Sequence, residues 1–158
     1  MLTLTSSAFE QNGKIPAKYT CDGDRELSPP LSWGGVPEKA ESLVLLMDDP
    51  DIPQFAKEKH GIEVFDHWTL FNIPPETREI LEGATAGTEG TNSAGAASYT
   101  GPCPPPEYEP SEHRYIFSLY ALDTLLDLAG GASKREVLDA LDGHALASAE
   151  LIGRYSRK

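Results

Sequence analysis

The sequence has few positive charges. Its 158 residues contain 13 lysines and arginines against 25 aspartates and glutamates, which gives a formal net charge of −12. A general nucleic-acid-binding protein needs a basic face to displace counterions from phosphates, and anionic membrane surfaces attract basic segments. The charge therefore argues against a nucleic-acid partner and against stable membrane association, while it leaves room for one small, locally positive pocket.

The sequence also lacks long apolar segments. The longest uninterrupted apolar run, residues 43–47, is far shorter than the roughly 20 residues that span a bilayer as a helix. The first five residues have neither the basic region nor the apolar core of a secretory signal. We therefore expect a cytoplasmic protein, in which residues 1–158 form one domain with its own hydrophobic core.

Several common catalytic signatures are missing. The sequence has no phosphate-binding loop that ends in Gly-Lys-Ser/Thr, no Gly-x-Ser-x-Gly elbow and no His-Glu-x-x-His pair. The two cysteines, Cys21 and Cys103, are too far apart for a zinc ribbon or a thioredoxin motif. The residues therefore predict no metal, no cofactor and no catalytic residue of these classes.

The pattern of apolar residues predicts strands first and helices near the C-terminus. We expect strands at residues 2–4, 42–47, 64–73 and 114–122. The proline-rich residues 28–33 should be extended, because proline fixes φ and biases the preceding residue away from helix. Long loops are expected at residues 83–101 and 102–110, which are rich in small residues and prolines.

Two helices are predicted after the last strand. Ser133 and Glu136 have the spacing of a capping box, and Gly143 is the expected stop of the first helix. Residues 144–154 are predicted as the second helix, because apolar residues recur on one helical stripe (Leu146, Ala149 and Ile152). Strands followed by helices indicate an antiparallel, mainly β domain with helices packed at one side.

Polar residues gather where the predicted strands begin or end. Asp49 and Asp51 follow the second strand, and His67 opens the apolar part of the third. His113 and Tyr115 share one face of the last strand, because side chains alternate with period two. Such junctions often carry binding sites. Each residue also has a plainer interpretation, as a turn aspartate, a hydrogen-bonded histidine or a sheet aromatic, and the spacing does not support zinc.

Five short motifs follow one another in a characteristic order. They are Ser28-Pro29-Pro30-Leu31-Ser32-Trp33, Asp49-Pro50-Asp51-Ile52-Pro53, Asp66-His67-Trp68, Gly101-Pro102-Cys103-Pro104-Pro105 and His113-Arg114-Tyr115-Ile116-Phe117. Together they closely resemble the phosphatidylethanolamine-binding protein family, also called Raf kinase inhibitor-like proteins, and more narrowly its bacterial and archaeal branch. The resemblance covers nearly the whole chain. It implies a mainly β fold, in which a large central antiparallel sheet packs against a smaller sheet.

The resemblance also implies a pocket that binds small anions, such as phosphate or a phosphoethanolamine headgroup. The ligand-binding residues carried over by motif are Asp49, His67, Gly101, Cys103, His113 and Tyr115. The histidines and the tyrosine would donate to the anion, while Asp49 would orient a histidine or accept from an ammonium group. The backbone donor of the family falls on either Gly101 or Cys103.

The sequence leaves three interpretations of function. The first is a non-enzymatic binder of a small anion or phospholipid headgroup, which acts as a regulator. The second is an inhibitor of a kinase or serine protease, in which the pocket is only modulatory. The third is a hydrolase, although no nucleophile stands out among the acid–base residues. Microbial relatives are commonly dimers, so the resemblance also implies a homodimer.

The two cysteines lie beside motif segments. Related microbial sequences often carry both, so the resemblance implies a disulfide or a close pair of Cys21 and Cys103. The alternative is two reduced, buried thiols, which a cytosol favours. Spacing alone does not decide between them.

Overall fold

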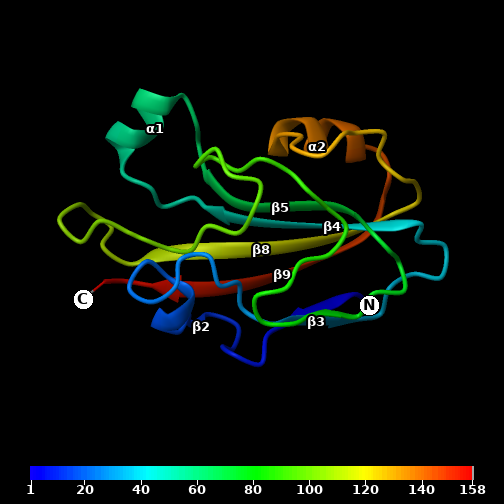
Figure 1. The fold of residues 1–158 in the computed structure, drawn as a ribbon, viewed down its shortest axis with the longest axis horizontal. Coiled ribbons are helices and arrows are strands. Elements are labelled where there is room, and N and C mark those ends of the chain that lie inside the picture. Colours follow the sequence, from blue (N-terminus) through cyan, green and yellow to red (C-terminus); the bar gives the residue numbers. More distant parts are fainter. Residues whose placement is uncertain (158) are drawn as a thin grey trace.

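The computed structural model describes residues 1–157 as two β-sheets with helices over one of them (Figure 1). The large sheet has the strand order β2-β9-β8-β4-β5-β7 and the small sheet the order β1-β3-β6. The strands are β1 (Thr3–Thr5), β2 (Gly13–Lys14), β3 (Leu31–Gly34), β4 (Ser42–Asp49), β5 (Phe65–Ile73), β6 (Glu79–Ile80), β7 (Thr88–Glu89), β8 (His113–Leu122) and β9 (Ala145–Tyr155). The helices are α1 (Gln54–His60) and α2 (Lys134–Leu141), with a 3-10 turn at Ala17–Tyr19. The predicted mainly β fold is confirmed.

The centre of the large sheet is antiparallel and almost completely buried. β4 pairs with β5 on one side and with β8 on the other, and β8 pairs with β9. The strands predicted from apolar runs at residues 42–47, 64–73 and 114–122 are confirmed to within two residues. Runs of apolar residues are typical of strands that are covered on both faces.

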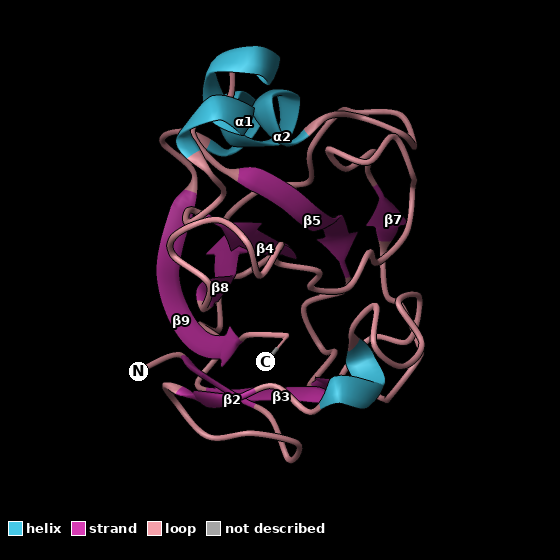
Figure 2. Ribbon diagram, turned by 90° about the vertical axis from the view of Figure 1, so that its left-hand side faces the viewer, coloured by secondary structure: helices cyan, strands magenta, loops and turns pink. Residues whose placement is uncertain are grey.

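Each face of the large sheet has its own apolar cluster. Leu45 and Met47 of β4 pack toward the small sheet, together with residues such as Trp33. Val44 and Leu46 face the opposite side, where α2 covers them (Figures 1 and 2). Successive side chains of a strand point to opposite faces. The last two residues of β4, Asp48 and Asp49, therefore serve different faces of the sheet.

The predicted helix at residues 144–154 is wrong, because this segment is strand β9. It pairs with β8 along its length, from Ala145 opposite Leu122 to Tyr155 opposite His113. Its alanines, leucines and glutamate favour helix locally, but the free edge of β8 provides backbone partners that outweigh this preference. Gly153 supports the arrangement, because the side chains of Ile15 and Phe9 occupy the space that a Cβ there would need.

The two helices differ in how visible they are in the sequence. The capping box of α2 is confirmed, since the Ser133 side chain accepts from the Glu136 amide and Glu136 reaches back to the Ser133 amide. Helix α1 was not predicted, because it has no buried residue and therefore no apolar stripe. Neither helix of residues 1–157 is long and apolar enough to cross a bilayer.

A buried and a partly buried carboxylate lie side by side on the α2 side of the sheet. Asp48 of β4 and Asp66 of β5 are register partners, and Lys134 Nζ of α2 lies 2.6 Å from Asp48 Oδ2. Thr69 Oγ1 donates to Asp66 Oδ2 at 2.6 Å. Burial raises the pKa of Asp66 to about 6, because desolvation penalises the charged form, and the neighbouring Asp48 charge adds to this effect.

Asp66→Asn is expected to stabilise the protein at pH 7.5 by about 1–2 kcal/mol, with little effect at pH 4. The folded-state pKa of Asp66 is about 6 and the ordinary value is 3.8, so ionisation weakens the fold as the pH rises through this interval. Urea unfolding at both pH values measures the difference. Asp139→Asn, on the exposed side of α2, is the matched control. A variant that is less stable than the parent at pH 7.5 would contradict this account.

Candidate functional site

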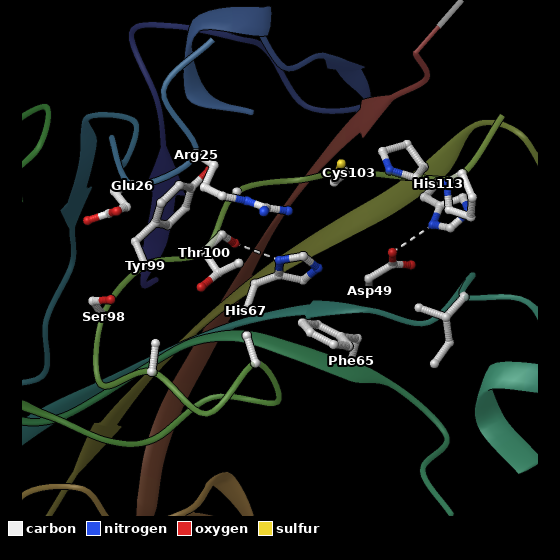
Figure 3. Close-up of a pocket in the computed structure, with 16 residues that line it drawn as sticks. Arg25, Glu26, Asp49, Phe65, His67, Ser98, Tyr99, Thr100, Cys103 and His113 are labelled. Carbon is white, nitrogen blue, oxygen red and sulfur yellow. Dashed lines mark hydrogen bonds and ion pairs between the residues drawn. The ribbon is translucent and has the colours of Figure 1, made fainter. Parts of the chain in front are cut away.

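A cavity of about 530 Å³ lies at the end of the large sheet where β4 ends and β5 and β8 begin. The strand register produces this meeting point, since Asp49 lies opposite Phe65 and Asp48 lies opposite Ile116. Asp49, His67 and His113 therefore project into one space from three neighbouring strands (Figure 3). Residues from the loop at 94–105, together with Arg25 and Glu26, close the other side.

His113 and Asp49 form a buried pair. His113 Nδ1 donates to Asp49 Oδ2 at 2.6 Å, and the two side chains are 1% and 4% exposed. This bond holds a hydrogen on Nδ1 and leaves the other ring nitrogen, Nε2, for a different partner. Within residues 1–157, His113 Nε2 is buried and has no hydrogen-bond partner. An unpartnered buried nitrogen beside a cavity indicates a place for a ligand atom.

His67 is held in the same way by a different acceptor. Its Nδ1 lies 2.6 Å from the carbonyl oxygen of Thr100. Because a carbonyl only accepts, Nδ1 must carry the hydrogen. Figure 3 shows the other ring nitrogen turned toward Asp49 and His113. Asn92 fixes this part of the loop, since its Nδ2 donates to the carbonyl oxygens of His67 and Ser98 and to Thr100 Oγ1.

The burial of His67 sets its charge state. Burial lowers the pKa of His67, and although the Thr100 carbonyl and the Asp49 charge act in the opposite direction, the net shift is downward. The empty cavity at pH 7 therefore holds a neutral His67 ring whose Nε2 is an acceptor. A ligand atom that meets this nitrogen must therefore donate to it, or the ring must first take up a proton.

Tyr115 lies behind the two histidines. Its ring is edge-on to His67 at 5.4 Å and stacked on His113 at 6.3 Å between ring centroids. It is completely buried and is not among the residues that line the cavity. Burial raises the pKa of Tyr115, so its hydroxyl keeps its proton, and within residues 1–157 this hydroxyl has no partner. The expected direct contact with the anion stays a prediction.

The second wall of the cavity contains a disulfide between Cys21 and Cys103, whose Cα atoms are 5.4 Å apart. The structure therefore has the linked form and not the two reduced thiols. Gly101 lies beside this link, and a Cβ there would collide with the carbonyl oxygen of Tyr19. The segment around Cys21, which precedes the first motif, therefore packs against the motif at residues 101–105.

Five of the six site residues expected from the sequence line the cavity, namely Asp49, His67, Gly101, Cys103 and His113. Asp51 serves a different purpose, because its carboxylate accepts from Arg114 Nε and Nη2, both at 2.9 Å, and fixes the loop after β4. Sequence reasoning missed Arg25 and Phe65, which also line the cavity. Arg25 lies in an exposed turn that carries no pattern, whereas Phe65 stands two residues before His67 and shares its face.

Comparisons with known proteins agree with this fold. A sequence model of the family described as Phosphatidylethanolamine-binding protein matches residues 5–156, and the chain belongs to this family. It is 47% identical over 163 residues to a UPF0098 protein of Methanothermobacter thermautotrophicus, with 99% of each chain covered. The name of this relative describes no enzymatic activity.

Two solved structures show the same fold over the full length. One is CT736, a phosphatidylethanolamine-binding protein homolog from Chlamydia trachomatis, with a TM-score of 0.90 and 42% identity over 99% of this chain and 98% of that one. The other is YbcL of E. coli, described as a member of the mammalian PEBP family, with a TM-score of 0.85 and 27% identity over 99% of each chain. The family and fold predictions are therefore confirmed.

Proposed function

We propose that this protein binds a small phosphate-containing anion in the cavity and does not turn it over. The observation that carries the proposal is the pair of buried imidazoles whose Nδ1 atoms are both engaged, His113 by Asp49 and His67 by Thr100. Both Nε2 atoms therefore remain available to a ligand. Protonated, they become two charged donors, and hydrogen bonds from charged donors to phosphate are among the strongest in proteins.

Asp49 has a supporting role in this site. A carboxylate beside an anion is unfavourable by itself, but here Asp49 Oδ2 accepts the hydrogen bond from His113 Nδ1. That contact fixes the His113 ring with its hydrogen on Nδ1 and leaves Nε2 without a partner among the described residues. The carboxylate therefore helps the anion indirectly, through the imidazole between them.

The cavity also has room for an organic part of the ligand. Its volume of about 530 Å³ is within the roughly 300–1,000 Å³ of typical small-molecule sites. Apolar side chains form much of the wall, including Ile52, Phe65, Pro104 and Pro105. These features favour a phosphate ester, such as a phospholipid headgroup or another small organic phosphate, over inorganic phosphate alone.

The chemistry of the lining residues favours binding over catalysis. Cys103 is in a disulfide and is therefore not a nucleophile. Thr100 Oγ1 accepts from Asn92, and within the described residues neither it nor the Ser98 hydroxyl is hydrogen-bonded to a histidine that would activate it. A hydrolase is thus not supported. Inhibition of a kinase or protease, and a homodimer, stay predictions from the resemblance.

Titration with inorganic phosphate, phosphoethanolamine and ethanolamine tests the proposal. We expect saturable one-site binding of the first two by calorimetry, with the nitrogen-15 signals of the two Nε2 atoms moving to the protonated range. Ethanolamine should not bind at the same concentrations. Binding of ethanolamine alone would overturn the proposal, and so would release of phosphate from phosphoethanolamine that His67→Ala abolishes.

A further inference from the structure

The cavity wall that faces the histidines is a joint between two distant segments. Besides the disulfide between Cys21 and Cys103, two backbone hydrogen bonds cross it. Cys21 N donates to the Pro102 carbonyl at 3.0 Å, and Gly101 N donates to the Arg25 carbonyl at 2.7 Å. The backbone of Arg25 is thus bonded directly to the loop that carries Thr100, whose carbonyl oxygen accepts from His67.

The Arg25 side chain reaches into the cavity. Figure 3 shows its guanidinium group pointing toward His67, whereas the carboxylate of the neighbouring Glu26 points away from it. Among residues 1–157 no ion pair or hydrogen bond engages the guanidinium. Two other cations of this region are paired with carboxylates, Lys18 with Glu82 at 2.8 Å and Arg157 with Asp22 at 3.3 Å.

The positive charge of Arg25 acts on the His67 ring across the cavity. The positive charge of Arg25 contributes to the lowered pKa of His67, after the larger effect of burial. The positive charges of Arg25 and of a protonated His67 repel each other when no anion lies between them. The same arrangement becomes favourable when an anion lies between the two groups, because each then compensates part of the ligand charge.

We infer that Arg25 is a third donor to the bound anion and that the Cys21–Cys103 disulfide holds it over the site. This inference rests on the proposed function. Burial lowers the pKa of His67, so this ring carries less charge as the pH rises, whereas a guanidinium stays charged at every pH of interest. Its planar fork also fits two phosphate oxygens at once. Arg25 therefore maintains anion binding under conditions in which the imidazoles alone would lose it.

The disulfide adds a covalent link to a turn that hydrogen bonds also hold, among them Gly101 N to the Arg25 carbonyl at 2.7 Å and Asp24 N to the Lys18 carbonyl at 3.0 Å. Residues 22–26 are exposed, so water competes with the backbone bonds of this turn. A dithiol reductant supplies two electrons and two protons, which convert the disulfide to two thiols while the reductant forms its own disulfide. The freed turn samples more positions, and the guanidinium loses its fixed distance to the anion.

Phosphate affinities of Arg25→Gln, Arg25→Lys, Cys21→Ser and the double variant Cys21→Ser/Arg25→Gln, at pH 6 and pH 8, test this inference. We expect Arg25→Gln to weaken binding about tenfold at pH 6 and by about the same factor at pH 8, because the guanidinium keeps its charge across this interval. Arg25→Lys should recover part of the loss. Cys21→Ser, or dithiothreitol on the parent protein, should give part of the same loss, and the double variant should bind no worse than Arg25→Gln.

Lys39→Gln is the matched control. It removes one exposed positive charge from the turn before β4, at the opposite end of the strand from Asp49. If Arg25→Gln behaves like Lys39→Gln, the inference is overturned while the proposed function stands. Additive losses in the double variant would show that the disulfide does not act through Arg25. Failure of the oxidised parent to bind phosphate at pH 6 would overturn the proposed function itself. If Cys21→Ser does not fold, the arginine variants still decide whether Arg25 is a donor.

Discussion

His113→Ala and His67→Ala should each weaken phosphate binding by about 10- to 100-fold at pH 6. Each substitution removes one charge-assisted hydrogen bond, and such bonds contribute about 1.5–3 kcal/mol. The Nε2 atom of His113 has no partner within the described part of the chain, so the free protein gives up no hydrogen bond of this atom when the ligand binds. Calorimetry or nuclear magnetic resonance titration measures both affinities.

His144→Ala is the control for these two variants. His144 Nδ1 contacts Asp123 Oδ1 at 2.8 Å, which repeats the imidazole–carboxylate pair of the site, but its side chain is 45% exposed. This variant should bind phosphate like the parent. His113→Ala leaves the buried Asp49 carboxylate without its partner, so thermal unfolding must accompany the binding data. His67→Ala leaves no such charge, and parental affinity in that variant would contradict the proposed site.

Asp49→Asn is expected to weaken phosphate binding by about tenfold or more at pH 7, although it removes a negative charge from the cavity. The amide replaces a charged acceptor of the His113 Nδ1 hydrogen with a neutral one, so the ring is held less firmly for the ligand. Repulsion alone predicts the opposite result, namely tighter binding of the anion by the variant.

Asp51→Asn separates these explanations. It removes the same charge two residues away, from a carboxylate that binds Arg114 and does not line the cavity. Its affinity for phosphate should match that of the parent. Tighter binding of phosphate by Asp49→Asn than by Asp51→Asn would show that Asp49 repels the ligand and does not act through His113.

The sequence predicts the centre of this fold better than its edges. β4, β5 and β8 are covered on both faces, and long apolar runs reveal such strands directly. β9 is covered on one face for much of its length, and its alanine-rich first half has the local preference of a helix. Its strand conformation follows from the edge of β8, which is a long-range partner that no local pattern records.

The site, too, is predicted only in part by the sequence. The order of the motifs indicates which residues meet, whereas the folded chain determines their hydrogen-bond partners. Ordered motifs bring Asp49, His67 and His113 together, because each motif marks the end of a strand. Their hydrogen-bond partners depend on the loop that crosses the cavity, so the pairing of His67 with Thr100 follows only from the folded chain. Tyr115 shares a face with His113, as period two predicts, but packs behind both rings.

The central claim is that anion binding and protonation of the buried His67 ring are one event. The most direct measurement is the number of protons taken up when sulfate binds at pH 7.5, from calorimetry in buffers of different ionisation enthalpy. Sulfate is a tetrahedral anion whose own charge is constant at this pH, so any protons go to the protein. The account predicts uptake of about one proton per anion, decreasing in His67→Ala. Binding without proton uptake would contradict it.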